Sequence, residues 1–313
     1  MNKFENFKRG VNLGGWLSQC VHTKEHYDSF IIERDVRELS TWNIDHLRVP
    51  VDYDLVETAD GEYKEEGFEY IQNAIDWCKK YHLNMILDLH KTFGYSFDDG
   101  EEESGFFENG KYQERFYKLW EQFAERFGKY EDMLAFELLN EVTDKEYCDT
   151  WNKVSYKCIE RIRKIAPTIN ILVGGYYNNS AEAVKDLAMP YDNHIVYNFH
   201  CYEPLRFTHQ GAYWMKGMDV NFRMDFADSN TTVEYFDELW ADAIKTAEER
   251  GVKLYCGEYG AIDRMKAEDA YNWYCVIHKA FEKHDIGHAA WSYKKMDFGL
   301  TDDYLKRVKE ELF

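Results

Sequence analysis

The 313-residue chain contains no stretch that approaches the roughly 18 consecutive apolar residues of a membrane-spanning helix. It also lacks clusters of lysine and arginine. Its formal net charge is −20, whereas a surface that binds nucleic acid needs basic side chains to neutralise phosphates. We therefore expect neither a membrane nor a nucleic acid as a partner, and the acidic surface mainly favours solubility.

Cysteine and proline are used sparingly and without pattern. The seven cysteines form no Cys-x-x-Cys pair and no regular spacing, which indicates neither a disulfide framework nor a zinc site, so we expect reduced thiols. The four prolines are scattered, and no glycine- or serine-rich linker or tandem repeat divides the chain, which predicts one domain over residues 1–313 and, we expect, a monomer. The first nine residues lack the apolar core and cleavage site of a signal peptide, leaving a cytoplasmic protein and a secreted protein without its leader as alternatives.

Short apolar runs alternate with amphipathic segments, which is typical of parallel strands joined by helices. The expected strands are Arg9–Trp16, Ile44–Val51, Asn84–His90, Leu134–Glu141, Asn170–Gly175, Ile195–His200, Lys253–Glu258 and Gly287–Ser292. The expected helices are Ser29–Ser40, Gly67–Lys80, Gln113–Phe127, Thr150–Ile165, Ser180–Ala188, Val233–Arg250, Ala267–Lys283 and Tyr304–Phe313. Eight such units favour a closed (β/α)8 TIM barrel over an open sheet.

Polar and aromatic residues gather at the carboxyl ends of these strands, the face on which barrel enzymes place their chemistry. They are Arg48, His90, Asn140, Glu141, His200, Tyr202, Glu258 and Trp291. Two connections on the same face are longer than ordinary strand-to-helix loops: residues 91–112 after the third strand and the insertion 203–232 after the sixth. We expect both to form walls of a cleft, although the acidic run Glu101–Glu103 is more typical of a solvated surface.

Two glutamates differ from the others because each lies where an apolar strand gives way to a loop. Glu141 ends the string LLNE (138–141), and Glu258 lies within CGEYG (256–260). Hydrolysis of a glycosidic bond needs two carboxyls at a fixed separation, since one protonates the leaving oxygen and the other attacks or stabilises an oxocarbenium-like centre. Glu137 lies deeper on the same expected strand, where we expect an ion pair or hydrogen bond.

These strings and several others resemble the motifs of glycoside hydrolase family 5, also called cellulase family A. In chain order the resembling segments are GVNLGGW (10–16), HLRVP (46–50), LDLH (87–90), LLNE (138–141), NFHCY (198–202), GEYG (257–260) and AWSY (290–293). The resemblance covers essentially the whole chain. Within the family, YNFH (197–200) and YKKMDF (293–298) resemble bacterial endoglucanases of the cellulase C type.

The resemblance implies a retaining double displacement in which Glu141 is the general acid and base and Glu258 is the nucleophile. A carboxyl crowded by a second carboxyl has a raised pKa and can hold a proton, which suits the acid. The resemblance also implies that Asn140 holds the hydroxyl next to the anomeric carbon and that His90 and His200 bind the sugar near the cleavage point. No cofactor is needed.

Further side chains complete the predicted cleft. Arg48 lies in a buried strand and needs an anionic partner, and with Tyr202 it is our candidate for keeping the nucleophile ionised. Trp291 is expected to stack on a sugar on the non-reducing side. Lys91 stands where cellulase C-type enzymes often have a second histidine, and we expect it to alter a sugar hydroxyl contact. Trp214 either stacks on a more distant sugar or anchors its loop.

The substrate expected from the resemblance is a β-1,4-linked or mixed-linkage β-glucan, cut by an endo-acting enzyme. β-Mannan, glucomannan and exo-acting β-1,3-glucan hydrolysis remain alternatives. The insertion 203–232 also looks shorter than in the cellulase C type, so their chain-length preference does not carry over.

Three hypotheses other than metal-free glycoside hydrolysis have less support in the sequence. A non-catalytic carbohydrate-binding barrel would have lost a carboxylate, whereas both glutamates are present. A phosphate-handling isomerase would need a glycine-rich anion loop where Glu258 lies. A metal site at His90 and His200, with Asp88 or Glu141, has no HxH or HExxH spacing to support it.

Overall fold

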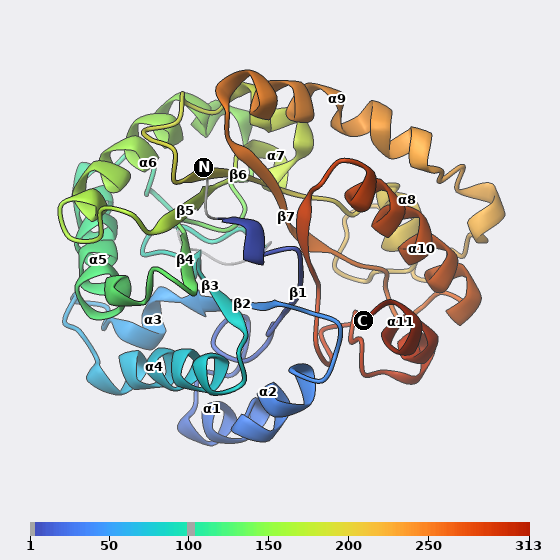
Figure 1. Ribbon diagram of the computed structural model, residues 1–313, viewed down its shortest axis with the longest axis horizontal. Coiled ribbons are helices and arrows are strands. Elements are labelled where there is room, and N and C mark those ends of the chain that lie inside the picture. The colour runs from blue at the N-terminus through green and yellow to red at the C-terminus, as the bar shows by residue number, and fades with distance from the viewer. Residues whose placement is uncertain (1–3, 99–103) are drawn as a thin grey trace.

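Eight parallel strands form a closed barrel in the computed structural model, which describes residues 4–98 and 104–313 (Figure 1). The strands are β1 (Arg9–Asn12), β2 (His46–Asp52), β3 (Asn84–Lys91), β4 (Leu134–Glu137), β5 (Asn170–Val173), β6 (Ile195–His200), β7 (Lys253–Tyr259) and β8 (Gly287–Ala290). They follow one another in chain order, and β1 pairs with both β2 and β8. The predicted (β/α)8 barrel is confirmed, while the acidic run Glu101–Glu103 lies outside the described residues.

Helices surround this barrel (Figure 1). The α-helices are α1 (Lys24–Phe30), α2 (Glu33–Leu39), α3 (Tyr53–Val56), α4 (Glu65–Lys80), α5 (Gly110–Phe127), α6 (Cys148–Arg163), α7 (Tyr176–Asn179), α8 (Leu205–Thr208), α9 (Val233–Arg250), α10 (Ala267–Lys283) and α11 (Lys306–Leu312). The 3₁₀-helices are η1 (Phe4–Asn6), η2 (Gly128–Tyr130), η3 (Lys145–Tyr147), η4 (Ala181–Asp186), η5 (Phe226–Asp228) and η6 (Asp303–Leu305). No helix within the described ranges has the length and apolar character needed to cross a membrane. All seven cysteines are free thiols.

The interior of the barrel has an apolar end and a polar end. At the amino-terminal end, Phe4 and Phe7 stack with their ring centroids 4.4 Å apart. They pack with a buried cluster from the strands: Ile86, Ala135, Leu172, Val196, Tyr255 and Ala289. The other end is polar because side chains alternate along a strand, so that Asp88 shares the inward face with Ile86.

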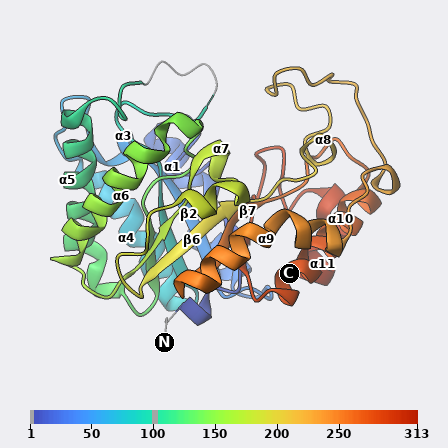
Figure 2. The same cartoon turned by 90° about the horizontal axis from the view of Figure 1, so that it is seen from above.

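Strand register assembles this polar end from distant parts of the sequence. Asn12 of β1 lies beside Arg48 of β2, and Asp88 of β3 lies beside Glu137 of β4. In the side view of Figure 2, the amino terminus is at one end of the barrel and the chain between α8 and α9 projects from the other. The predicted insertion 203–232 therefore stands at the carboxyl ends of the strands.

The predicted helix Ser29–Ser40 is wrong, because the chain forms two helices, α1 and α2, separated by the extended residues Ile31 and Ile32. Asp35 accepts a hydrogen bond from the Ile32 backbone N–H (2.9 Å), and this capping contact starts a new helix. Because both isoleucines are apolar, the hydrophobic periodicity continues across them, and it did not reveal the break between α1 and α2. The predicted helix Ser180–Ala188 is a 3₁₀-helix, η4, instead of an α-helix. The predicted helix Tyr304–Phe313 is α11 preceded by the 3₁₀-helix η6.

Four predicted strands are too long at their carboxyl ends. β1, β4, β5 and β8 stop at Asn12, Glu137, Val173 and Ala290, before the predicted ends at residues 16, 141, 175 and 292. Beyond β4 the chain forms hydrogen bonds first to β5 and then to β3. Leu138 N–H donates to the Leu172 carbonyl (3.2 Å), and Asn140 N–H donates to the Leu89 carbonyl (3.0 Å). The strand-end residues of the LLNE motif therefore lie on an irregular segment.

The stacked Phe4–Phe7 pair leads to a stability prediction. Phe7→Ala removes a ring that is 4% exposed and leaves a cavity, so the free energy of unfolding should fall by about 3 kcal/mol or more. Urea unfolding followed by circular dichroism measures this change. Val21→Ala is the control, because Val21 is 70% exposed and its loss should stay within about 0.5 kcal/mol. Equal urea midpoints for the two variants would show that the Phe4–Phe7 pair at the amino-terminal end of the barrel does not stabilise the fold.

Candidate active site

The guanidinium of Arg48 lies at the centre of the polar end and is fully buried. Its Nε and Nη2 donate to the two carboxylate oxygens of Glu137 (2.7 and 2.8 Å). Nη1 donates to Asn12 Oδ1 (2.9 Å) and Glu258 Oε1 (2.8 Å). Nη2 also donates to Asn140 Oδ1 (2.8 Å). Every guanidinium nitrogen is therefore engaged, and the predicted anionic partner of this buried cation is present.

Three buried carboxylates share the charge of Arg48. Asp88 Oδ2 lies 3.0 Å from Nη2, in addition to the contacts with Glu137 and Glu258. Burial raises the pKa of Asp88 to about 7, and the nearby guanidinium opposes that rise. Glu137 also accepts a hydrogen bond from Asn198 Nδ2 (2.7 Å), so it has the ion-pairing role predicted for it. The sequence analysis did not assign Asp88 to this network, although the alternation in LDLH places it on the inward face.

Glu258 lies inside β7 and is held at both oxygens. Arg48 donates to Oε1, and the Tyr202 hydroxyl donates to Oε2 (2.9 Å), so both predicted donors contact it. Burial raises the pKa of Glu258 to about 7, and His200, the Arg48 charge and the Tyr202 hydrogen bond oppose that rise. The direct cation and hydroxyl contacts favour the ionised form of this carboxyl.

Glu141 has neutral donors instead. Its Oε1 lies 2.8 Å from His200 Nδ1, and its Oε2 accepts a hydrogen bond from Asn178 Nδ2 (2.8 Å). Its backbone carbonyl accepts one from the Tyr95 hydroxyl (2.6 Å). Burial raises the pKa of Glu141 to about 7, and burial lowers the pKa of His200 to about 4. His200 is therefore a neutral imidazole at pH 7, and Glu141 can hold a proton near that pH.

Asn140 has one end bound and one end free for a ligand. Its Oδ1 accepts from Arg48, while its buried Nδ2 has no hydrogen-bond acceptor among the residues that the structure describes. A buried amide N–H without an acceptor is costly. A substrate hydroxyl would satisfy it, in agreement with the contact that the sequence analysis expects.

His90 and Trp291 are both buried and stack on each other. The two rings are parallel within 2°, with centroids 5.7 Å apart. His90 Nδ1 lies 2.5 Å from Asp88 Oδ2, and burial lowers the pKa of His90 well below its usual value. A neutral imidazole that donates from Nδ1 keeps Nε2 as an acceptor. Trp291 is only 6% exposed, so most of its indole is already enclosed by protein.

Lys91 is buried, and its Nζ lies 2.7 Å from Asp98 Oδ2. Asp98 also accepts a hydrogen bond from Gln19 Nε2 (2.9 Å). The lysine that replaces the expected second histidine thus takes part in a bridge between the connections that follow β1 and β3. This ion pair within the protein was not anticipated from the sequence.

Trp214 belongs to an aromatic cluster beside Tyr202. Its ring centroid lies 6.5 Å from that of His209 and 6.4 Å from that of Phe298. Both of those rings also contact Tyr202. The Arg264 guanidinium lies 5.7 Å from the Trp214 ring, and the indole is 39% exposed. The ring therefore anchors its loop, which is one of the two predicted alternatives, and stacking of its exposed part on a distant sugar stays a prediction.

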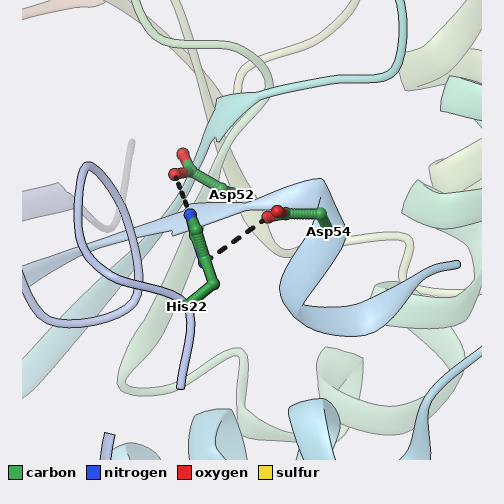
Figure 3. A group of neighbouring side chains, drawn as sticks. All are labelled: His22, Asp52 and Asp54. Carbon is green, nitrogen blue, oxygen red and sulfur yellow. Dashed lines mark ion pairs between the residues drawn. The ribbon is translucent and has the colours of Figure 1, made fainter. Parts of the chain in front are cut away.

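One further group of metal-ligating residues is explained by protein contacts. His22 Nε2 lies 3.5 Å from Asp52, while its Nδ1 lies 3.6 Å from Asp54 (Figure 3). The two carboxylates thus face different ring nitrogens. Asp52 already accepts hydrogen bonds from Ser18 Oγ (2.7 Å) and the Gln19 backbone N–H (2.9 Å). The hydrogen bond to Asp52 raises the pKa of His22, and this contact joins the loop after β1 to the end of β2.

Sequence reasoning predicted His200 as a site residue but missed Tyr95 and Asn178, which also contact Glu141, because they come from loops. Tyr95 follows β3, and Asn178 follows β5. The only available signal was the Tyr-Tyr-Asn-Asn string at residues 176–179, directly after a strand of the barrel, since asparagine readily adopts the left-handed conformations found in tight turns.

Comparison with known proteins agrees with this geometry. The sequence profile of the cellulase family, glycosyl hydrolase family 5, matches residues 8–297. Cellodextrinase A of Ruminococcus flavefaciens is 52% identical over 286 residues, which cover 91% of this chain and 85% of the relative. Endoglucanase C of Acetivibrio thermocellus is 39% identical over 334 aligned residues, covering 98% of this chain and 97% of the relative.

Among solved structures, the endoglucanase Cel5A of Thermotoga maritima has a TM-score of 0.86 and covers 99% of this chain and 100% of its own, at 22% identity. That similarity concerns the fold. The profile match and the two relatives show in addition that this chain is a glycoside hydrolase and belongs to glycoside hydrolase family 5, the cellulase family.

Proposed function

We propose that the protein is an endo-acting β-glucanase that hydrolyses β-1,4 linkages with retention of configuration. Glu141 protonates the glycosidic oxygen while the Glu258 carboxylate attacks the anomeric carbon, so that the C–O bond to the leaving group breaks and a glycosyl ester forms. Water then attacks the same carbon, Glu141 takes its proton, and Glu258 leaves as the carboxylate.

The observation that carries the proposal is the spacing of the two carboxyls. One oxygen of Glu141 and one of Glu258 lie within 4.8 Å of each other, with His200 Nδ1 inside the same limit. Retaining enzymes hold their carboxyls about 5–5.5 Å apart, whereas inverting enzymes need roughly 6.5–9.5 Å to admit a water. The short separation supports direct attack by Glu258.

The electrostatic asymmetry of the pair supports the assignment of roles. Glu258 receives hydrogen bonds from a cation and a hydroxyl, which stabilise a carboxylate nucleophile. Burial raises the pKa of both carboxyls to about 7, so the asymmetry lies in their partners: Glu141 receives neutral donors, which suits a group that gives up a proton and later takes one. The free Nδ2 of Asn140 is available for the sugar hydroxyl next to the anomeric carbon.

The proposed linkage rests on the relatives. The cellodextrinase and the endoglucanase cover most of this chain at 52% and 39% identity, and their names denote action on cellodextrins and on glucans. A glucan 1,3-beta-glucosidase of Blumeria graminis matches only 48% of the chain, at 28% identity. Cello-oligosaccharides and soluble β-1,4-containing glucans are therefore the proposed substrates.

Replacing either carboxyl tests the roles. With cellotetraose, Glu141→Gln should lower kcat/KM by about 10²–10⁴-fold, because the acid is lost, and Glu258→Gln should abolish turnover. With a 2,4-dinitrophenyl β-cellobioside, whose leaving group needs no proton, Glu141→Gln should keep most of its kcat/KM and Glu258→Gln should not. Glu249→Gln on α9 is the control, since its side chain is 66% exposed. Full activity of either active-site variant on cellotetraose would refute the assignment.

The stereochemical course can be followed by proton NMR during hydrolysis of a cello-oligosaccharide. Retention predicts that the β-anomer of the new reducing end appears first and then mutarotates. The α-anomer as first product would overturn the double displacement while leaving glycoside hydrolysis intact.

A substrate panel tests the linkage. We expect release of reducing ends from carboxymethyl cellulose, barley mixed-linkage glucan and cello-oligosaccharides, and no release from laminarin, which lacks β-1,4 bonds. Faster cleavage of mannan than of any glucan would favour the mannanase alternative, and cleavage of laminarin alone would favour the β-1,3 alternative.

The pH dependence follows from the proton on Glu141. Its pKa is raised to about 7, and the first step needs the protonated form, so kcat/KM on cellotetraose should decline as pH rises through about 7. The activated dinitrophenyl substrate should lack this basic limb. A profile that stays flat to pH 9 on cellotetraose would show that a different group supplies the proton.

A further inference from the structure

The connection after β5 has an unusual backbone. Tyr177, Asn178 and Asn179, here called the left-handed turn, have φ values of 51°, 56° and 56°. A left-handed conformation costs roughly 1–2 kcal/mol for an ordinary residue, although asparagine tolerates it better than most. Strained residues of this kind persist only where the surroundings hold them, and they cluster at functional sites.

The surroundings that hold the left-handed turn belong to the segment that carries Glu141. The Tyr177 backbone N–H donates to the Thr143 carbonyl (3.1 Å), and the Asn178 N–H donates to the Val142 carbonyl (2.9 Å). Val142 and Thr143 follow Glu141 directly in the chain. The turn and the acid segment are thus joined by two backbone hydrogen bonds, which fix the position of one relative to the other.

The side chains of the left-handed turn contact Glu141 and its partner His200. Asn178 Nδ2 donates to Oε2 at 2.8 Å. Asn179 is fully buried, and its Nδ2 lies 3.4 Å from His200 Nε2. With Nε2 as acceptor, the proton of the neutral imidazole is on Nδ1, which lies 2.8 Å from Glu141 Oε1. One oxygen is therefore supported directly and the other through His200.

Because Gly174 has no side chain, it leaves room for the contact between Asn179 and His200. A Cβ at this position would lie 2.3 Å from Asn179 Oδ1, so a larger residue would displace the buried amide. The backbone strain, the two hydrogen bonds to the acid segment and this close approach all favour the same arrangement, in which two amides face the acid and its histidine.

We propose that Asn178 is a positioning residue for the acid and base of the reaction, holding the Glu141 carboxyl in the rotation that presents its proton to the glycosidic oxygen. The proposal rests on the function proposed above. A neutral amide suits this task, because it orients the carboxyl without the strong bias toward the ionised form that a cation would impose. Its hydrogen bond lowers the pKa of Glu141, which burial raises, and so keeps that pKa near neutral pH.

Two substitutions remove the donor while preserving the backbone. Asn178→Gly keeps the left-handed conformation without strain and deletes the side chain. Asn178→Asp keeps the size and the tolerance for this conformation but replaces the N–H donor with a second carboxylate facing Glu141. Asn230→Gly is the matched control, because Asn230 has a φ of 56° and is exposed on the connection before α9.

For Asn178→Gly, kcat/KM on cellotetraose should fall about tenfold, since a hydrogen bond to a charged group and correct orientation are both lost. The value on 2,4-dinitrophenyl β-cellobioside should stay within about twofold, because that leaving group needs no proton. The basic limb of the cellotetraose profile should move up by about one pH unit, as the ionised carboxyl loses a donor. Asn178→Asp should move it further, because two carboxylates repel.

A purely structural role would give a different pattern. The melting temperature would drop and kcat/KM would fall equally on both substrates, with an unchanged pH profile, and this result would overturn the proposal. Wild-type behaviour of both Asn178 variants would also overturn it. Measuring Glu141→Gln alongside distinguishes failure of this proposal from failure of the proposed function. If that variant shows no dependence on the leaving group, the assignment of Glu141 as the acid itself fails.

Discussion

The buried guanidinium of Arg48 is the interaction on which the rest of the site depends. Removing a cation from water costs several kcal/mol, and the cost is offset only when hydrogen-bond geometry is good and every donor is satisfied. Here the donors reach Glu137, Asp88 and Glu258, together with two asparagine oxygens. A lysine offers a single point of charge and could not replace this planar fork. Without the cation, three carboxylates would be buried unpaired, so folding and chemistry need the same residue.

The same cation also makes the two reacting carboxyls different. Glu258 touches Arg48, whereas Glu141 touches His200 and Asn178, which are neutral donors at pH 7. Two identical side chains thereby receive different hydrogen-bond partners, and this difference is what lets the proposed mechanism give one the acid role and the other the nucleophile role. Glu137 is as buried as either of them but binds Arg48 through both oxygens, which leaves it no lone pair directed toward a substrate.

The sequence was sufficient for the barrel and for the strand-borne part of the site, because period-two alternation and strand count are local properties. Arg48, Glu137 and Glu258 all lie within strands, and their contacts followed from that placement. Tyr95 and Asn178, which contact Glu141, were not predictable in the same way, since they come from loops whose paths depend on capping contacts and left-handed residues. The break at Ile31 and Ile32 was missed for the same reason, because a capping hydrogen bond from Asp35 outweighed an uninterrupted apolar pattern.

This division between strand and loop corresponds to what each carboxyl has to do. As the proposed nucleophile, Glu258 approaches the anomeric carbon from one direction, and a position inside β7, bonded on both sides to neighbouring strands, fixes it rigidly. As the proposed acid and base, Glu141 gives a proton in the first step and takes one in the second. A segment beyond the end of β4 allows its donors to come from β6 and from the connection after β5, where they can be neutral. A second strand-borne glutamate would instead lie, as Glu137 does, in direct contact with the Arg48 guanidinium, whose charge lowers the pKa of a carboxyl that burial raises.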